Sequence, residues 1–282
     1  MPEIVWYPGH MARAKRLIKE ALPNIDMVIE LLDARAPISS QNPDFKSLFG
    51  NKPVLTLLTK SSLADPNATQ YFINKLRRAG REIIAIDCKD GKNIKSIQTG
   101  INTLMKEKLE RDAARGIKRP IRAMVVGITN VGKSTLINTI SGTKKAVAQD
   151  RPGVTRHNSR ISVPSLGLEL TDTPGILWHK FDDELVGVKL ACLGSIKDEI
   201  LDTLSLSCRL IGLIRGKYAN LITERFKVEF TDDDSDYDIF NKIGRKRGFL
   251  MAGGVIDEDR CAGVILDEFR GAKVGRITLD ME

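Results

Sequence analysis

One eight-residue segment near the middle of the chain constrains the fold more than any other feature. Residues 127–134, with the sequence GITNVGKS, have the spacing G-x-x-x-x-G-K-S of a phosphate-binding loop. An apolar run at 123–126 precedes the segment, and an apolar-periodic run at 135–140 follows it. This succession of strand, loop and helix is the context in which the motif binds phosphates. We therefore expect a nucleoside triphosphate site at the end of a buried strand, the alternative being a chance match in a surface loop.

The chemistry of this loop assigns roles to its residues. Glycines let backbone N–H groups surround the phosphates, and the N-terminus of the following helix favours anions. Lys133 is expected to reach the β- and γ-phosphates, and the Ser134 hydroxyl is expected to ligate magnesium. The expected nucleotide-binding residues of this segment are Asn130, Val131, Gly132, Lys133, Ser134 and Thr135.

Apolar runs before and after the loop predict an α/β domain. Three of these runs are predicted strands: residues 26–33, 53–60 and 82–87. Helices are expected at residues 10–22, at 70–79 and, as one long helix, at 93–115. Nearly continuous apolar strands that alternate with helices are typical of a mostly parallel sheet covered on both faces. Two more strand-like runs follow the phosphate loop, at 159–163 and 168–170.

The character of the sequence changes after about residue 183. From there apolar residues recur at helical spacing, as at Ile196, Ile200 and Leu204, without strand-like runs. A length of 282 residues also favours two domains. We therefore expect an α/β domain at 1–183 and an all-α domain at 184–282.

Net charge and cysteine content indicate which partners the protein could bind and which compartment it occupies. The net charge of +8 and the isoelectric point near 9.3 hint at a polyanionic partner without establishing one. Four scattered cysteines without a C-x-x-C pair favour reduced thiols over a disulfide framework or a zinc site. The sequence shows neither a secretory signal nor a run long enough to span a bilayer. We expect a cytoplasmic protein that does not bind membranes.

Two segments after the loop have the residues of nucleotide switches. Asp172 and Gly175 form D-x-x-G at a predicted strand end. There the carboxylate would orient magnesium or its water, and the glycine N–H would contact the γ-phosphate. Thr155 lies between the two motifs, where GTPases place the threonine that completes the magnesium shell.

The segment that would recognise the base lies before the phosphate loop. GTPases recognise guanine with Asn-Lys-x-Asp at a strand end; the candidate here is Thr59, Lys60, Ser61 and Ser62. The stem of Lys60 could lie along the purine, but Ser62 cannot match the strength with which a carboxylate accepts two hydrogen bonds from guanine. Asp65 comes three positions too late to substitute simply. Asp87 and Cys88 would form the next loop, with the Cys88 N–H bonded to the guanine carbonyl oxygen.

The motifs run in the order base recognition, purine loop, phosphate loop, first switch, second switch, which is a circular permutation of the usual GTPase order. Nearly the whole chain resembles the ribosome biogenesis GTPase A (YlqF-type) family of circularly permuted GTPases. The segments that carry the resemblance are 6–11 (WYPGHM), 32–35 (LDAR), 172–178 (DTPGILW), 194–198 (GSIKD) and 246–251 (KRGFLM). The resemblance implies a GTPase that acts in late assembly of the large ribosomal subunit and contacts RNA through its C-terminal helical domain. We also expect magnesium as the cofactor, ribosomal RNA of the large subunit as the partner, and a monomer off the ribosome. The departures at Thr59 and Ser62 leave guanine selectivity open.

The residue that activates water is not the usual one. Ile176 occupies the position where many GTPases have a glutamine, and it cannot orient water. Because the chain has the family's Pro-Gly-His-Met segment, the resemblance makes His10 the candidate to orient or polarise the water. An ordinary packing histidine is the alternative, and His157 and His179 are weaker candidates. The expected catalytic residues are His10 and Lys133.

Two further roles stay open between alternatives. In related GTPases an asparagine at the position of Asn130 accompanies a potassium ion that supplies positive charge, but Asn130 could also only stabilise the loop. A basic cluster would contact RNA phosphates, or it would be a solvated helix end; its cations are Lys242, Arg245, Lys246 and Arg247. The neighbouring Phe249 is a candidate for stacking on a base.

The permutation suggests how nucleotide state would reach the helical domain. The second switch leads into that domain within about ten residues of Gly175, so its ordering would alter the domain's placement on RNA. Two alternatives remain open: an RNA-binding scaffold that holds nucleotide with little turnover, and relaxed purine use that includes ATP.

Overall fold

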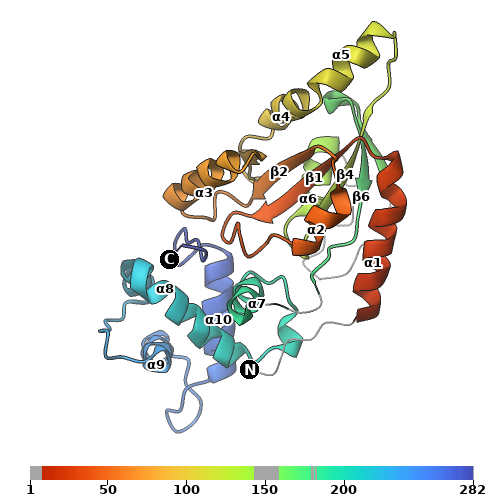
Figure 1. Cartoon of the computed structure of the whole chain (residues 1–282). Helices are drawn as coiled ribbons and strands as arrows, with labels where there is room; N and C mark the ends of the chain where they lie inside the picture. Colours follow the sequence, from red (N-terminus) through yellow and green to blue (C-terminus); the bar gives the residue numbers. More distant parts are fainter. Residues whose placement is uncertain (1–7, 143–158, 179–180, 182, 282) are drawn as a thin grey trace.

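The computed structural model describes residues 8–142, 159–178, 181 and 183–281, with the backbone alone for 8–11 and 159. Within these ranges a six-stranded sheet forms one half of the molecule and a group of helices the other (Figure 1). The strands are β1 (Met27–Asp33), β2 (Val54–Thr59), β3 (Glu82–Ala85), β4 (Ile121–Gly127), β5 (Ser159–Val163) and β6 (Leu168–Asp172).

The sheet is mostly parallel, as predicted. Its strand order is β3-β2-β1-β4-β6-β5, and every neighbouring pair is parallel except β5 with β6 at one edge. All seven residues of β1 are buried. A central strand covered on both faces has no solvent side, which explains its continuous apolar run.

Helices cover both faces of the sheet. The helices of this half are α1 (Pro8–Ala21), α2 (Pro43–Phe49), α3 (Pro66–Arg78), α4 (Ser96–Leu104), α5 (Lys106–Ala114) and α6 (Lys133–Ser141). Alternate side chains of β1 point to opposite faces. Ile29 and Leu31 belong to the cluster that includes α4 and α6, whereas Val28 packs with residues of α1 and α2. Short 3-10 helices are η1 (Leu22–Asn24), η2 (Pro164–Leu166) and η3 (Asp198–Ile200).

The helices differ from the prediction in three places. Helix α3 begins four residues before the predicted start because the Asp65 carboxylate caps its first turn at 2.8 and 3.2 Å. The short helix α2 was not expected. The predicted single helix over 93–115 is wrong, since the backbone leaves the helix at Met105 (φ −103°, ψ 10°). Met105 is still buried in the core, whereas α5 buries none of its residues, so α5 diverges into solvent.

Among the residues described from 183 to 281, the second half contains four α-helices and no strand of the sheet. They are α7 (Glu184–Cys192), α8 (Thr203–Phe226), α9 (Asp236–Arg247) and α10 (Glu258–Arg270). Helix α8 is kinked at Tyr218, whose backbone has φ −119° and ψ 28°. The predicted helical character of this region is confirmed, while the domain division at 183/184 stays a prediction.

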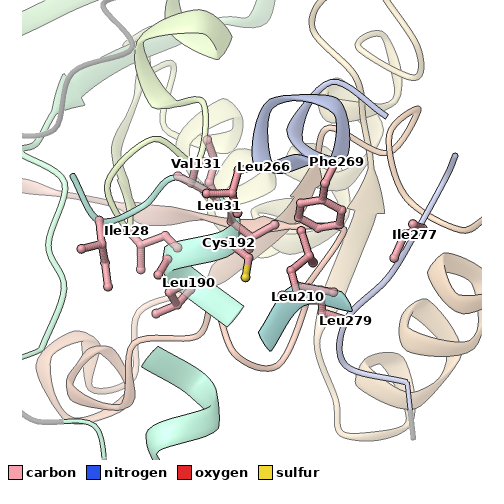
Figure 2. Close-up of a cluster of buried hydrophobic side chains, with 14 of the residues drawn as sticks. Leu31, Ile128, Val131, Leu190, Cys192, Leu210, Leu266, Phe269, Ile277 and Leu279 are labelled. Carbon is pink, nitrogen blue, oxygen red and sulfur yellow. The ribbon is translucent and has the colours of Figure 1, made fainter. Parts of the chain in front are cut away.

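One buried cluster joins the two halves (Figure 2). It includes Leu31, Ile128, Val131, Leu190, Cys192, Leu210, Leu266, Phe269, Ile277 and Leu279. These side chains come from β1, the phosphate loop, α7, α8, α10 and the tail after α10. The helical region therefore packs directly against the loop that follows β4.

Candidate functional site

The carboxyl ends of the parallel strands bring the predicted site residues to one edge of the sheet. Asp33 ends β1, Thr59 ends β2, Gly127 ends β4 and Asp172 ends β6. Asp33 and Thr59 are direct neighbours in the register of β1 and β2. Ligands of open α/β sheets bind at this edge, beyond the ends of the strands.

Two segments far apart in sequence meet there. The Thr59 hydroxyl donates to the carbonyl oxygen of Val131 at 2.7 Å. The Lys60 ammonium donates to the carbonyl oxygen of Asn130 at 2.7 Å and to the Asp33 carboxylate at 3.0 Å. Segments 59–62 and 127–134 therefore lie side by side, as the sequence requires for a shared nucleotide site. Their contacts with a base stay a prediction.

The phosphate loop places its lysine inside the fold. Gly132 precedes α6 with φ +104°, a left-handed conformation that favours glycine. The Lys133 ammonium donates to the carbonyl oxygens of Gly127 at 3.2 Å and Ile128 at 2.8 Å. Burial lowers the pKa of Lys133 to about 8 despite the opposing attraction of Asp172. Phosphate oxygens near this group would favour its protonated form.

A buried ion pair beside the loop was missed from the sequence. Both carboxylate oxygens of Asp33 accept hydrogen bonds from the Arg35 guanidinium, at 2.9 and 2.8 Å, and both side chains are 2% exposed. Burial would raise the pKa of Asp33, but Arg35 and Lys60 hold it well below its usual value. Arg35 also donates to the carbonyl oxygen of Arg270 in the helical half at 3.1 Å. The only signal was an aspartate and an arginine directly after a buried strand.

The base side of the candidate site contains a carboxylate on a different loop from the expected one. The Ser62 hydroxyl donates to Oδ2 of Asp87, and the Lys89 N–H donates to Oδ1 at 2.8 Å. Burial would raise the pKa of Asp87, but these hydrogen bonds bring it below its usual value. Burial raises the pKa of the neighbouring Cys88 thiol to about 11, so this thiol is neutral.

The second-switch segment touches the phosphate loop. A Cβ atom at Gly175 would lie 2.9 Å from the Lys133 ammonium and 2.9 Å from Cα of Thr129, so only glycine fits here. Asp172 is 2% exposed, and its Oδ1 atom has no hydrogen-bond partner among the residues that the structure describes. Burial raises the pKa of Asp172, against the attraction of Lys133.

The residues after Gly175 pack into two different clusters. Ile176 lies in the cluster of α1 and α2, which also contains Ile18. Leu177 and Trp178 lie in the cluster shared with the helical half. A displacement of this segment would therefore disturb packing on both sides.

Several predicted residues cannot be placed. His10 belongs to the first turn of α1, but its side chain is outside the described residues. Thr155, His157 and His179 are also outside the described residues. Their predicted roles stay predictions.

The helical half binds the phosphate loop through two carbonyl groups that the sequence did not reveal. The Asn130 amide nitrogen donates to the carbonyl oxygen of Gly194 at 2.7 Å, and the Thr129 hydroxyl donates to that of Ser195. Gly194 and Ser195 follow α7, in a segment known beforehand only as part of the family resemblance. The amide of Asn130 thus has a structural contact, and its potassium role stays untested.

The tail after α10 binds the base-side loop. The Arg276 guanidinium donates to the carbonyl oxygens of Ser61 at 3.1 Å and Ala64 at 2.9 Å. Asp65 accepts a hydrogen bond from Tyr218 of α8 at 3.0 Å. The helical half therefore contacts both parts of the candidate nucleotide site.

The basic cluster on α9 is only partly available to a partner. Lys242 pairs with Asp234 at 2.7 Å, and Arg247 lies 3.6 Å from Glu268, whereas Arg245 and Lys246 are exposed. The prediction that Phe249 stacks on a base is not supported. Its ring is 9% exposed because it packs in the core, with the Arg260 guanidinium 5.1 Å from its centre.

The described residues contain neither a membrane-spanning helix nor a metal-ligand cluster. No helix among them combines the length and apolarity needed to cross a bilayer. They also contain no group of three or more histidine, cysteine or acidic side chains arranged to hold a metal ion.

The strand order, the loop after β4 and the segment after β2 define a circularly permuted P-loop GTPase. A family model described as "50S ribosome-binding GTPase" matches residues 122–222. Ribosome biogenesis GTPase A of Priestia megaterium is 44% identical over 279 residues, covering 98% of this chain and 96% of that protein. Mitochondrial ribosome-associated GTPase 1 of Mus musculus is 31% identical, covering 98% of this chain and 90% of that protein.

Solved structures of YlqF proteins are similar to this chain over nearly its whole length. YlqF of T. maritima bound to GNP has a TM-score of 0.66 and 26% identity, covering 95% of this chain and 97% of that one. A GDP-bound YlqF structure has a TM-score of 0.67 and 25% identity, covering 93% and 97%. The chain belongs to the ribosome biogenesis GTPase A (YlqF-type) family. It is a GTPase that binds guanine nucleotides and takes part in ribosome assembly, and GTPases of this kind generally use magnesium.

Proposed function

We propose that this GTPase is a cytoplasmic factor that acts in late maturation of the large ribosomal subunit, with its helical half on ribosomal RNA. The match to 50S ribosome-binding GTPases supports this role. The exposed Arg245 and Lys246 and the net charge of +8 would favour a phosphate-rich partner.

The observation that carries the proposal is the bonding of the phosphate loop to the helical half. Thr129 and Asn130 belong to the loop that would surround the phosphates, and both donate to carbonyl groups after α7. A nucleotide that shifts the loop would therefore shift α7 and its neighbours. The second switch provides a further route, because Ile176 and Leu177 pack into different clusters.

The residues present fit a magnesium ion. Asp172 has a buried carboxylate oxygen without a hydrogen-bond partner among the described residues, and oxygen atoms are the ligands magnesium prefers. Ser134, Thr155 and Asp172 would hold the ion or its waters. Bound there, magnesium would neutralise charge on the β- and γ-phosphates.

The chain's own groups have separate proposed roles in hydrolysis. Lys133 would bind the β- and γ-phosphates, and Gly175 would approach the γ-phosphate through its N–H. His10 would orient the attacking water; Ile18 and Ile176 pack in one cluster, so α1 is attached to the second switch. The amide nitrogen of Asn130 is bonded to Gly194, which leaves its oxygen as the atom that would ligate potassium. Equal hydrolysis rates in sodium and potassium salts would remove the potassium role.

The test measures phosphate release over many turnovers, alone and with isolated large or small ribosomal subunits. We expect large subunits to stimulate turnover and small subunits not to do so. The double variant Arg245→Ala, Lys246→Ala should keep the basal rate and lose the stimulation. A matched control, Lys106→Ala with Arg111→Ala, removes one lysine and one arginine from the exposed face of α5.

Each part of this proposal would be contradicted by a different result. Stimulation by small subunits, or by neither subunit, would contradict the proposed target. Equal stimulation of the α9 variant and its α5 control would contradict RNA contact through α9. Subunit binding without multiple turnover would favour the alternative, a nucleotide-holding RNA-binding scaffold.

A further inference from the structure

Residue 62 lacks the carboxylate that the guanine-recognition motif requires, yet a carboxylate lies directly against it. The Ser62 hydroxyl donates to Oδ2 of Asp87, and the Ser62 N–H points to the same atom at 3.4 Å. The two residues belong to adjacent loops after β2 and β3. These loops are held together by the Ser61 N–H, which donates to the carbonyl oxygen of Ile86 at 3.1 Å.

Asp87 is built to stay ionised. It is 4% exposed, and its other oxygen, Oδ1, accepts hydrogen bonds from the backbone N–H groups of Lys89 at 2.8 Å and Asp90 at 3.4 Å. Donors surround the carboxylate on both oxygens, so its pKa lies below the usual value in spite of burial. An ionised carboxylate can only accept hydrogen bonds. The proton between the two side chains therefore belongs to Ser62.

This arrangement determines what Ser62 can offer a ligand. A hydroxyl has one proton to donate and two lone pairs that accept. With its proton committed to Asp87, the half-buried Ser62 hydroxyl can only accept from a ligand. A free hydroxyl would instead rotate to donate or accept, and it would suit either purine.

The two purines differ in this respect at N1 and C2; at C6, where the Cys88 N–H is expected, guanine has a carbonyl acceptor and adenine an amino donor. Guanine carries donors, N1–H and the 2-amino group, on its pairing edge, whereas adenine presents an unprotonated N1 and no 2-amino group. An obligate acceptor placed at N1 and C2 bonds the guanine donors there and faces adenine N1 acceptor to acceptor. Discrimination then arises from a penalty on adenine as well as from a bond to guanine.

We propose that Asp87 makes the Ser62 hydroxyl an obligate acceptor, and that this pair selects guanine over adenine in place of the carboxylate missing at position 62. The inference rests on the proposed placement of the base at residues 59–62 and 87–88. Ser62 would touch the base, and Asp87 is a positioning residue that acts through Ser62. The negative charge of Asp87 would also strengthen the hydrogen bond that Ser62 accepts.

The test is the ratio of GDP to ADP affinity, measured by calorimetry on the full chain without ribosomal subunits. Asp87→Asn keeps the shape and an acceptor for the Lys89 N–H, but its amide group donates to Ser62 and frees the serine proton. We expect the preference for GDP to fall at least about tenfold, because GDP binds more weakly and ADP more tightly. Ser62→Ala should also lower the preference, because it removes both the acceptor for guanine and the acceptor that opposes adenine N1, but unlike Asp87→Asn it offers adenine no new donor.

The matched control is Asp90→Asn, which removes an exposed carboxylate from the same loop and should keep the wild-type ratio. Binding of tripolyphosphate, which uses the phosphate loop alone, shows that each variant is folded. A wild-type ratio in Asp87→Asn or in Ser62→Ala would overturn the proposal, as would a wild-type protein that binds GDP no tighter than ADP. Because no ribosomal subunit is present, these outcomes are independent of the assembly role.

Discussion

The phosphate side and the base side of this nucleotide site are built in different ways. On the phosphate side, residues 127–134 follow a continuous motif whose chemistry is mostly that of the backbone. On the base side, the motif at 59–62 is incomplete, and a carboxylate comes from Asp87 on the next loop. Backbone chemistry requires a particular local spacing, whereas a side-chain function can be supplied from any segment that the fold brings near.

The largest predicted effect concerns hydrolysis on the phosphate side. His10→Ala should leave GDP and GTP affinity unchanged and slow phosphate release by about 100-fold or more, because water would lose its orienting group. Single-turnover phosphate release measures this directly. His157→Ala and His179→Ala are the comparison variants, and near-normal turnover of His10→Ala would eliminate its role.

Lys133→Met should weaken every nucleotide alike. Loss of the ammonium removes charged hydrogen bonds to phosphates, so affinity should fall roughly 100-fold, equivalent to about 3 kcal/mol. The GDP to ADP ratio should not change, in contrast to the base-side variants. Thermal unfolding should show no loss of stability, since the variant removes a buried charge. A changed ratio of GDP to ADP affinity would show that the phosphate side and the base side of the site do not act independently.

Nucleotide affinity should fall with rising pH because of Lys133. Its pKa of about 8 means that the ammonium, which phosphates require, is about three quarters populated at pH 7.5 and about one quarter at pH 8.5. GDP affinity should therefore drop about threefold between these values, with proton uptake on binding at pH 8.5. Calorimetry in two buffers of different ionisation enthalpy measures the uptake. Lys133→Met should show neither effect, and uptake that persists in that variant would assign it to another group.

Among the substitutions that lower nucleotide affinity, Arg276→Ala should have the smallest effect, confined to the base side. Its guanidinium holds the carbonyl groups of Ser61 and Ala64, and losing these bonds would loosen the loop by about 1 kcal/mol. GDP affinity should fall about fivefold, while tripolyphosphate affinity stays constant. Arg225→Ala, which breaks a pair with Glu268 inside the helical half, is the control. An equal loss in both variants would indicate general destabilisation.

The sheet and the position of the site could be predicted because they depend on local patterns. Buried parallel strands are apolar throughout, and the phosphate loop has a characteristic spacing between a strand and a helix. The break at Met105 could not be predicted, because one non-helical residue does not disturb the apolar pattern. The resemblance named the segment around Gly194 without a role, since its contact with Asn130 uses a backbone carbonyl group that any residue has.

The Ser62–Asp87 pair shows the same limit on the base side. The two residues are 25 positions apart, and only the pairing of neighbouring loops brings them together. From sequence, Ser62 is a defect in a motif and Asp87 a member of the next loop. Because the two side chains are hydrogen-bonded, they can act together on the base, which the sequence alone did not indicate.

Hydrogen exchange measured by mass spectrometry, with and without GDP, tests most directly whether both sides hold one nucleotide. Peptides that cover residues 58–64 and 127–135 should both exchange more slowly with GDP, with the same midpoint concentration. Slower exchange at 127–135 with no change at 58–64 would contradict the shared site.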